Sequence, residues 1–115
     1  MRYLIPLLLL AAPLHAEAPM IEGATAQPSG DSWRVSVTLR HPDTGWDHYA
    51  DGWRVELPDG TVLATRVLAH PHETEQPFTR SQSGIRIPAG TTEVRIRARC
   101  LVDGWSEETQ ALNLP

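Results

Sequence analysis

Apolar and polar residues alternate with a period of two along most of the chain, which is the pattern of half-buried β-strands. In the clearest run, residues 33–40, the apolar positions are Trp33, Val35, Val37 and Leu39. No window carries apolar residues at helical spacing over three turns. One face of this strand is therefore expected to pack against a core, while the other face meets solvent.

Turn residues divide the alternating pattern into about seven short strands. The expected strands cover residues 21–27, 33–40, 53–57, 61–68, 85–87, 94–100 and 109–114. Pro58-Asp59-Gly60 separates the third from the fourth, so these two are expected to be antiparallel neighbours in a hairpin. Strands so regularly divided by turns are typical of a sandwich, and Trp33 and Trp53 are expected in its core.

The N-terminal residues have the pattern of a secretory signal peptide. Arg2 supplies the positive charge, an apolar stretch runs to Leu14, and Ala16 offers a small residue at the cleavage point. The stretch is too short to cross a bilayer. We therefore expect a signal peptide over residues 1–16 and one mature domain over residues 17–115. Because no cysteine follows the apolar run, no membrane anchor is expected, and the location is predicted to be periplasmic or secreted.

Charge and cysteine content restrict the partners and the fold further. The chain has a net charge of −4, and loss of Arg2 with the signal makes it more negative, which argues against nucleic acid and anionic membranes. Cys100 is the only cysteine, so no intramolecular disulfide is expected. It falls on the apolar face of residues 94–100 and is predicted to be buried.

Two segments, residues 41–52 and 69–83, escape the alternation and are expected to be ordered loops that carry the function. The four histidines of the mature chain lie in or beside them. Because residues two apart in an extended segment point to the same side, His70 and His72 are expected to offer both imidazoles to one metal ion.

The candidate metal ligands are these loop histidines with nearby acids: His41, His48, His70, His72, Asp47 and Glu73. Imidazole with carboxylate suits zinc or copper(II), and the acids would complete the shell or orient a ring. The alternative is a set of solvated loop histidines, one of which satisfies a backbone carbonyl.

Trp46, Tyr49 and Arg80 are the candidates for contact with a ligand or partner. The two aromatic rings could stack on a sugar or grip a peptide, and the alternative is that they pack the loop against the sandwich. Arg80 could instead pin its loop to an acidic neighbour. The outward row of Arg95, Arg97 and Arg99 is expected to pair with acids across the strands, and the alternative is an anion site.

No enzyme signature is present in the sequence. Asp43-Thr44-Gly45 spells the aspartic protease tripeptide, but that chemistry needs a second carboxylate, so we interpret it as a turn. The sequence has no nucleophile elbow, phosphate-binding glycine loop or zinc protease helix. Cys100 is predicted to face inward, where a thiol is unreactive. We therefore expect no catalytic activity.

The C-terminal quarter of the chain resembles a fibronectin type III domain. Pro88-Ala89-Gly90 leads into the alternating strand 94–98, and Gly104 and Ser106 follow in a hairpin, as in the last two strands of that family. The resemblance implies an all-β, immunoglobulin-like or fibronectin type III-like antiparallel β-sandwich of about seven strands. The two loops are also similar to those of small exported bacterial proteins of unknown function.

The sequence as a whole predicts an exported, non-catalytic binding module whose ligand meets the two loops. The ligand is an unknown protein or small molecule, and the sharper hypothesis is a zinc or copper(II) site. The alternative is a structural or protein-interaction domain that binds no metal.

Overall fold

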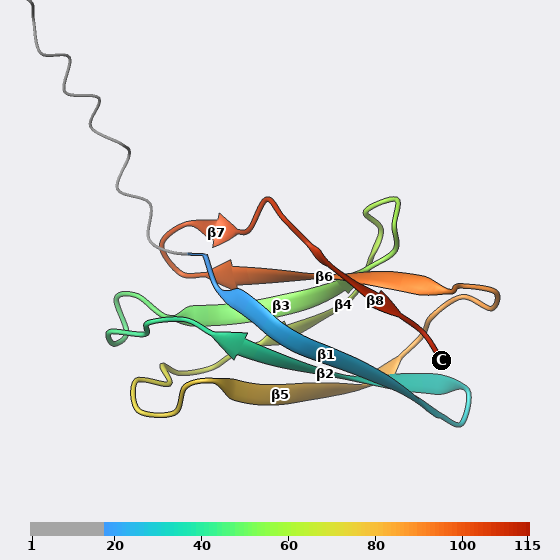
Figure 1. The fold of residues 1–115 in the computed structure, drawn as a ribbon, viewed down its shortest axis with the longest axis horizontal. Coiled ribbons are helices and arrows are strands. Elements are labelled where there is room, and N and C mark those ends of the chain that lie inside the picture. Colours follow the sequence, from blue (N-terminus) through green and yellow to red (C-terminus); the bar gives the residue numbers. More distant parts are fainter. Residues whose placement is uncertain (1–17) are drawn as a thin grey trace, which may run out of the picture.

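The computed structural model describes residues 18–115, and all the secondary-structure elements in that range are β-strands (Figure 1). The strands are β1 (Met20–Ser29), β2 (Ser32–Arg40), β3 (Ala50–Glu56), β4 (Val62–Val67), β5 (Phe78–Ile85), β6 (Glu93–Cys100), β7 (Gly104–Trp105) and β8 (Gln110–Asn113). The predicted all-β class is confirmed for this range. The expected signal peptide lies outside the described residues. Among residues 18–115, no helix is long and apolar enough to span a bilayer.

The strands form two antiparallel sheets. One has the order β1-β2-β5, and the other has the order β4-β3-β6, with β7 and β8 both pairing along the free side of β6. The chain crosses between the sheets after β2, after β4 and after β5. Figure 1 shows the two sheets as layers whose strands run along the long axis of the molecule. The ends of β2, β6 and the start of β3 consequently meet at one end of the layers.

Apolar side chains from both sheets fill the space between them. Val35, Val37 and Leu39 on β2 are fully buried, and Trp53 on β3 is 1 % exposed, as their alternation predicted. Trp33 is only half-buried, which corrects its expected place in the core. Trp33 is the first inward residue of β2, next to the turn from β1, so its ring packs against the edge of the core and stays partly exposed.

Strand β5 is longer than predicted, and the loop before it is correspondingly shorter. The sequence placed a strand at residues 85–87 and a loop over 69–83, whereas β5 starts at the buried Phe78. The middle of β5 is polar, so the alternation of apolar and polar residues did not predict this strand. Its polar residues are paired across the sheet instead, with Ser36 Oγ 2.7 Å from Ser81 Oγ and Thr38 Oγ1 2.7 Å from Thr79 Oγ1.

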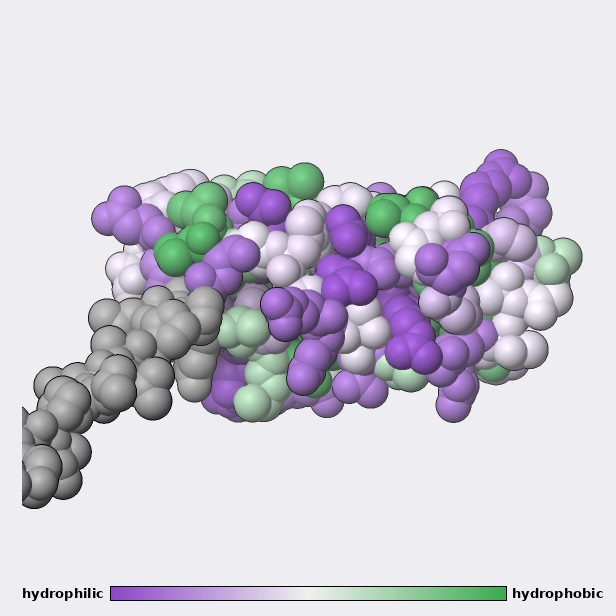
Figure 2. Space-filling model, turned by 90° about the horizontal axis from the view of Figure 1, so that it is seen from above, coloured by the Kyte–Doolittle hydropathy of each residue, from purple (hydrophilic) through white to green (hydrophobic). Residues whose placement is uncertain are grey.

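The predicted hairpin is confirmed, because β3 and β4 pair antiparallel through a turn at Gly60. Gly60 has a φ of +92°, a left-handed conformation that favours glycine. The other expected loop is also shorter at its end, since Ala50 to Gly52 already belong to β3. Figure 2 shows hydrophilic side chains spread over one face of the molecule with small hydrophobic areas between them.

The arginine row on β6 is paired with acids, as the sequence predicted. Arg97 Nε lies 2.7 Å from Glu56 Oε2, and Arg54 Nε from β3 contacts the same oxygen at 2.7 Å. The two flanking arginines pair with Asp51 and Glu93. Hydrogen bonds from Arg97, then from Arg54, outweigh burial and lower the pKa of the Glu56 carboxyl.

Replacing Glu56 by glutamine is expected to lower the free energy of unfolding by about 1.5–3 kcal/mol at neutral pH. Because the pKa of Glu56 is lowered on folding, its contribution is complete above the ordinary glutamate value and is lost as pH falls through the folded value. Urea unfolding of both proteins over a pH series measures this. Glu22→Gln, which removes an exposed pair with Arg40, is the control and should change little. A pH-independent difference for Glu56→Gln would contradict the assignment.

Candidate metal centre

Three side chains with metal-ligating atoms meet at one end of the sandwich. His41 directly follows β2, His48 lies in the loop before β3, and Cys100 is the last residue of β6. One nitrogen of each imidazole and the Cys100 Sγ all lie within 4.8 Å of one another. Both sheets and one connecting loop therefore contribute to a single cluster, which we call the His–Cys cluster.

A tight turn returns His48 towards His41. The Thr44 amide donates to the His48 carbonyl at 3.0 Å, and the His48 amide donates to the Gly45 carbonyl at 3.1 Å. Gly45 has a φ of +131°, which a residue with a side chain rarely adopts. The two imidazole rings meet edge to face, with their centroids 4.6 Å apart.

Backbone pairing brings the same loop to the end of β6. Ala50 at the start of β3 pairs with Cys100, and the Leu101 amide donates to the Tyr49 carbonyl at 2.9 Å. The Cys100 Sγ accepts a hydrogen bond from the Asp103 amide at 3.3 Å. Hydrogen bonds of this kind orient sulfur ligands in metal centres.

The imidazoles of the cluster have nitrogen atoms without partners. His41 and Cys100 are both 0 % exposed, and His48 is half-buried. Nε2 of His41 and Nε2 of His48 are buried and have no hydrogen-bond partner. A buried polar atom without a partner costs about 1–3 kcal/mol, so a ligand that bonded to these nitrogens would stabilise the folded cluster.

The Asp43 carboxylate holds His41 from the other side of the ring. Asp43 Oδ1 lies 2.6 Å from His41 Nδ1 and also accepts the Ala50 amide at 3.0 Å. Oδ2 accepts the His72 amide at 2.7 Å. When Nδ1 donates its proton to Asp43, the lone pair of the ring lies on Nε2, which is buried and has no hydrogen-bond partner.

His70 and His72 form a separate pair in the second loop. Among the described residues, the metal-like group includes His41 and His48 but neither of these two. Their ring centroids are 4.5 Å apart, and His72 stacks on Phe78 at 3.9 Å. His70 is exposed, and its Nδ1 lies 3.0 Å from the Pro71 carbonyl. It therefore matches the alternative that the sequence left open, a loop histidine that satisfies a backbone carbonyl.

Arg80 closes the second loop. Its Nη2 donates to His72 Nε2 at 3.0 Å, and its Nη1 lies 3.4 Å from Glu75 Oε1. Burial first, and then the Arg80 charge, lower the pKa of His72, so this ring is neutral at pH 7. Arg80 therefore ties its loop to the acidic Glu75, which is one of the two roles that the sequence left open for it.

The remaining candidates lie on the rim of the first loop. Trp46 is 66 % exposed and meets the half-buried Tyr49 edge to face, with centroids 5.8 Å apart. Asp47 is exposed. Glu73 is also exposed, and its Oε1 lies 3.5 Å from the place where a Cβ on Gly45 would stand. Neither acid joins the His–Cys cluster, so their expected role as ligands stays a prediction.

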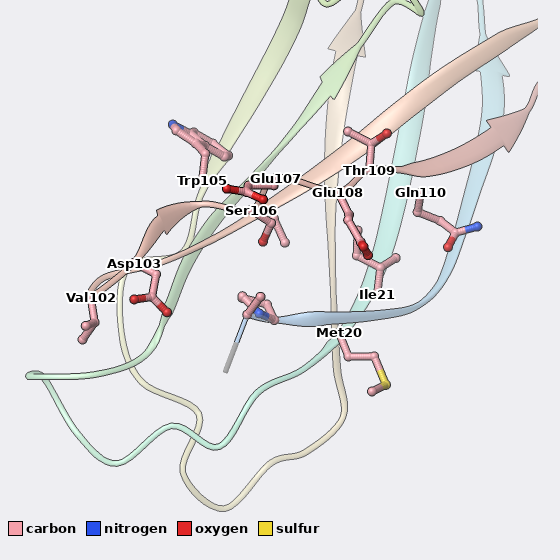
Figure 3. A pocket seen from close by; sticks show the side chains of 13 residues that line it. Met20, Ile21, Val102, Asp103, Trp105, Ser106, Glu107, Glu108, Thr109 and Gln110 are labelled. Carbon is pink, nitrogen blue, oxygen red and sulfur yellow. The ribbon is translucent and has the colours of Figure 1, made fainter. Parts of the chain in front are cut away.

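An open pocket that contains none of the three cluster residues lies elsewhere in the fold, and Figure 3 shows the side chains that line it. It is an open space of about 930 Å³ between the start of β1 and the segment that contains β7. Its lining includes Met20, Trp105 and the acids Glu107 and Glu108, and it includes no histidine or cysteine.

Sequence reasoning missed Cys100 as a candidate ligand. The predicted burial of Cys100 is confirmed, since it is 0 % exposed. No sequence signal links it to the histidines, because the two meet only through the pairing of β6 with the start of β3.

Fold and cluster together define a small all-β domain with a buried His–Cys cluster between its sheets. No protein-family model matches the chain. It is 38 % identical over 97 residues to a "Putative lipoprotein" from Halomicrobium mukohataei, a match that covers 84 % of this chain and 47 % of that protein. The chain therefore spans about half the length of this relative.

Among solved structures, the chain is similar to a hypothetical protein from Pyrococcus horikoshii OT3, with a TM-score of 0.55. The match covers 86 % of this chain and 88 % of that one, at 13 % sequence identity. At this identity the likeness shows the fold alone.

Proposed function

We propose that this chain is an exported, non-catalytic module that binds one zinc or copper(II) ion through His41, His48 and Cys100. A single observation carries the proposal: three ligand atoms lie within 4.8 Å of one another, and two buried imidazole nitrogens there have no partner. An ion at the usual distances of about 2.0–2.3 Å needs side-chain shifts of roughly 1 Å or less.

The chemistry of the three ligands fits these metals. Zinc and copper are bound by imidazole and thiolate, and a centre with three protein ligands leaves a fourth position for water or a small ligand. His48 is half-buried, whereas His41 and Cys100 are fully buried, so the open position is expected on the His48 side.

The cluster and the adjoining Asp43 together offer a thiol, an imidazole and a carboxylate, the groups of a cysteine hydrolase. We propose that it is not one, because such a nucleophile must be reached by its substrate. Cys100 and His41 are both 0 % exposed. The open pocket beside β7 is lined by neither of them.

Two further parts of the proposal rest on coarser observations. Strand order and the crossings between the sheets support an immunoglobulin-like or fibronectin type III-like sandwich for residues 17–115. The signal-like N-terminus and the name of the relative, a lipoprotein, support export, with a periplasmic or secreted location.

Calorimetric titration of the processed chain with zinc and with copper(II) tests the proposal. One ion per chain is expected, and the affinity should fall as pH is lowered, because the ion binds neutral imidazole and thiolate and competes with protons for both. His48→Ala should lower the affinity at least about tenfold. His70→Ala removes an exposed imidazole outside the cluster and is the matched control. No binding at micromolar protein, or equal loss in both variants, would contradict the proposal.

A second candidate function is protein interaction without metal, favoured by the exposure of Trp46 at 66 %. An exposed tryptophan beside Tyr49 is a suitable anchor for a partner. Pull-down from the native compartment distinguishes the two functions. Partners lost in Trp46→Ala and kept in His48→Ala would favour this second function.

A further inference from the structure

Among residues 18–115, Asp43 is the acid whose buried side chain is bonded to a residue of the His–Cys cluster. Its side chain is fully buried, and its backbone position follows His41 by two residues. The carboxylate accepts hydrogen bonds from His41 Nδ1, the Ala50 amide and the His72 amide. These three hydrogen bonds engage both oxygens of the side chain and fix it beside the His41 ring.

The charges around the cluster balance for only one class of ion. A metal-bound Cys100 thiolate and the Asp43 carboxylate carry one negative charge each, and the neutral imidazoles of His41 and His48 carry none. A divalent ion brings the sum to zero. A monovalent ion such as copper(I) leaves one net negative charge beside the fully buried His41 and Cys100. Burying an uncompensated charge costs free energy.

The other charged groups nearby do not alter this balance. Arg80 contacts His72 and not the cluster, and Glu75 pairs with Arg80 within the second loop. Asp51, at the start of β3, is paired with Arg99. His72 is neutral at pH 7, and its Nδ1 lies 3.9 Å from Asp43 Oδ2.

We propose that Asp43 is a positioning residue that gives the centre its preference for divalent over monovalent ions. It acts in two ways, by turning His41 Nε2 towards the metal and by supplying a buried negative charge next to a ligand ring. This inference rests on the proposed function, because it concerns the ion held by His41, His48 and Cys100.

Asp43→Asn separates the two contributions. The asparagine oxygen can still accept from His41 Nδ1 and the Ala50 amide, while the charge is lost and an NH₂ group faces the His72 amide. Zinc and copper(I) affinities are measured by competition with chelators, for the wild type and the variant. Zinc affinity is expected to fall about 10–100-fold. Copper(I) affinity should fall less, so that the zinc-to-copper(I) affinity ratio drops at least about tenfold, and the potential of bound copper should rise.

Asp31→Asn is the matched control, since it removes the same charge from an exposed position outside both histidine loops. It should leave the affinity ratio unchanged. Should Asp43→Asn not fold, Asp43→Ser provides the same comparison with a smaller side chain that can still accept a hydrogen bond. Equal losses for zinc and copper(I) would mean that Asp43 is only structural, and this would overturn the inference. Failure of the wild type to bind either ion would instead overturn the proposed function.

Discussion

Replacing Cys100 by serine is expected to reduce metal affinity roughly a hundredfold or more. Loss of an outer-shell partner already costs about 10–100-fold, and Cys100 supplies the only thiolate of the proposed centre. Cobalt(II) is a suitable probe, because thiolate bound to cobalt(II) gives a charge-transfer band in the near ultraviolet. The wild type should show this band after cobalt addition, and Cys100→Ser should not.

The serine variant is expected to fold. Serine is close to cysteine in size, and its hydroxyl can accept the hydrogen bond that the Asp103 amide now gives to sulfur. Circular dichroism and thermal unfolding without metal check this. A folded Cys100→Ser protein that binds cobalt as tightly as the wild type would exclude Cys100 from the centre.

Trp53→Ala is expected to lower the free energy of unfolding by about 3–5 kcal/mol. Trp53 is 1 % exposed and is the largest of the fully buried side chains among the described residues, so its truncation leaves a cavity between the sheets. A domain of this size is typically stable by only about 5–15 kcal/mol, and the variant should be partly unfolded in mild denaturant.

Trp46→Ala is the control for this experiment. Trp46 is 66 % exposed, so the same substitution should change the free energy of unfolding by no more than about 0.5 kcal/mol. Urea unfolding followed by circular dichroism measures both variants. Equal destabilisation by the two substitutions would contradict the assignment of Trp53 to the core and of Trp46 to the surface.

The alternating pattern predicted the strands that have one apolar face. Val35, Val37 and Leu39 on β2, like Val94 and Ile96 on β6, are buried because their strands each face the core with every second residue. The pattern could not reveal β5, because between its buried ends it is a run of polar residues. These residues form strand through pairing with β2, which is information that a single segment does not contain.

The candidate site was predictable in part. The histidine loops were identified, and His41 and His48 lie together in the His–Cys cluster. His70 and His72 lie side by side as expected, but Phe78 stacks on the His72 ring and Arg80 contacts its Nε2. Sequence spacing could not predict that Cys100 lies near the two histidines, because that contact depends on the register of β3 against β6.

The position of the His–Cys cluster has a consequence for how long the folded protein survives. His41 directly follows a strand of one sheet, and Cys100 ends a strand of the other. A bound ion would therefore cross-link the two sheets at that end. An ion present at a thousand times its dissociation constant adds about 4 kcal/mol to the stability of the folded state. Proteases act on the opened chain, so supply of the ion would govern how long each molecule survives. The abundance of this domain would then follow the metal content of its surroundings without any dedicated regulator.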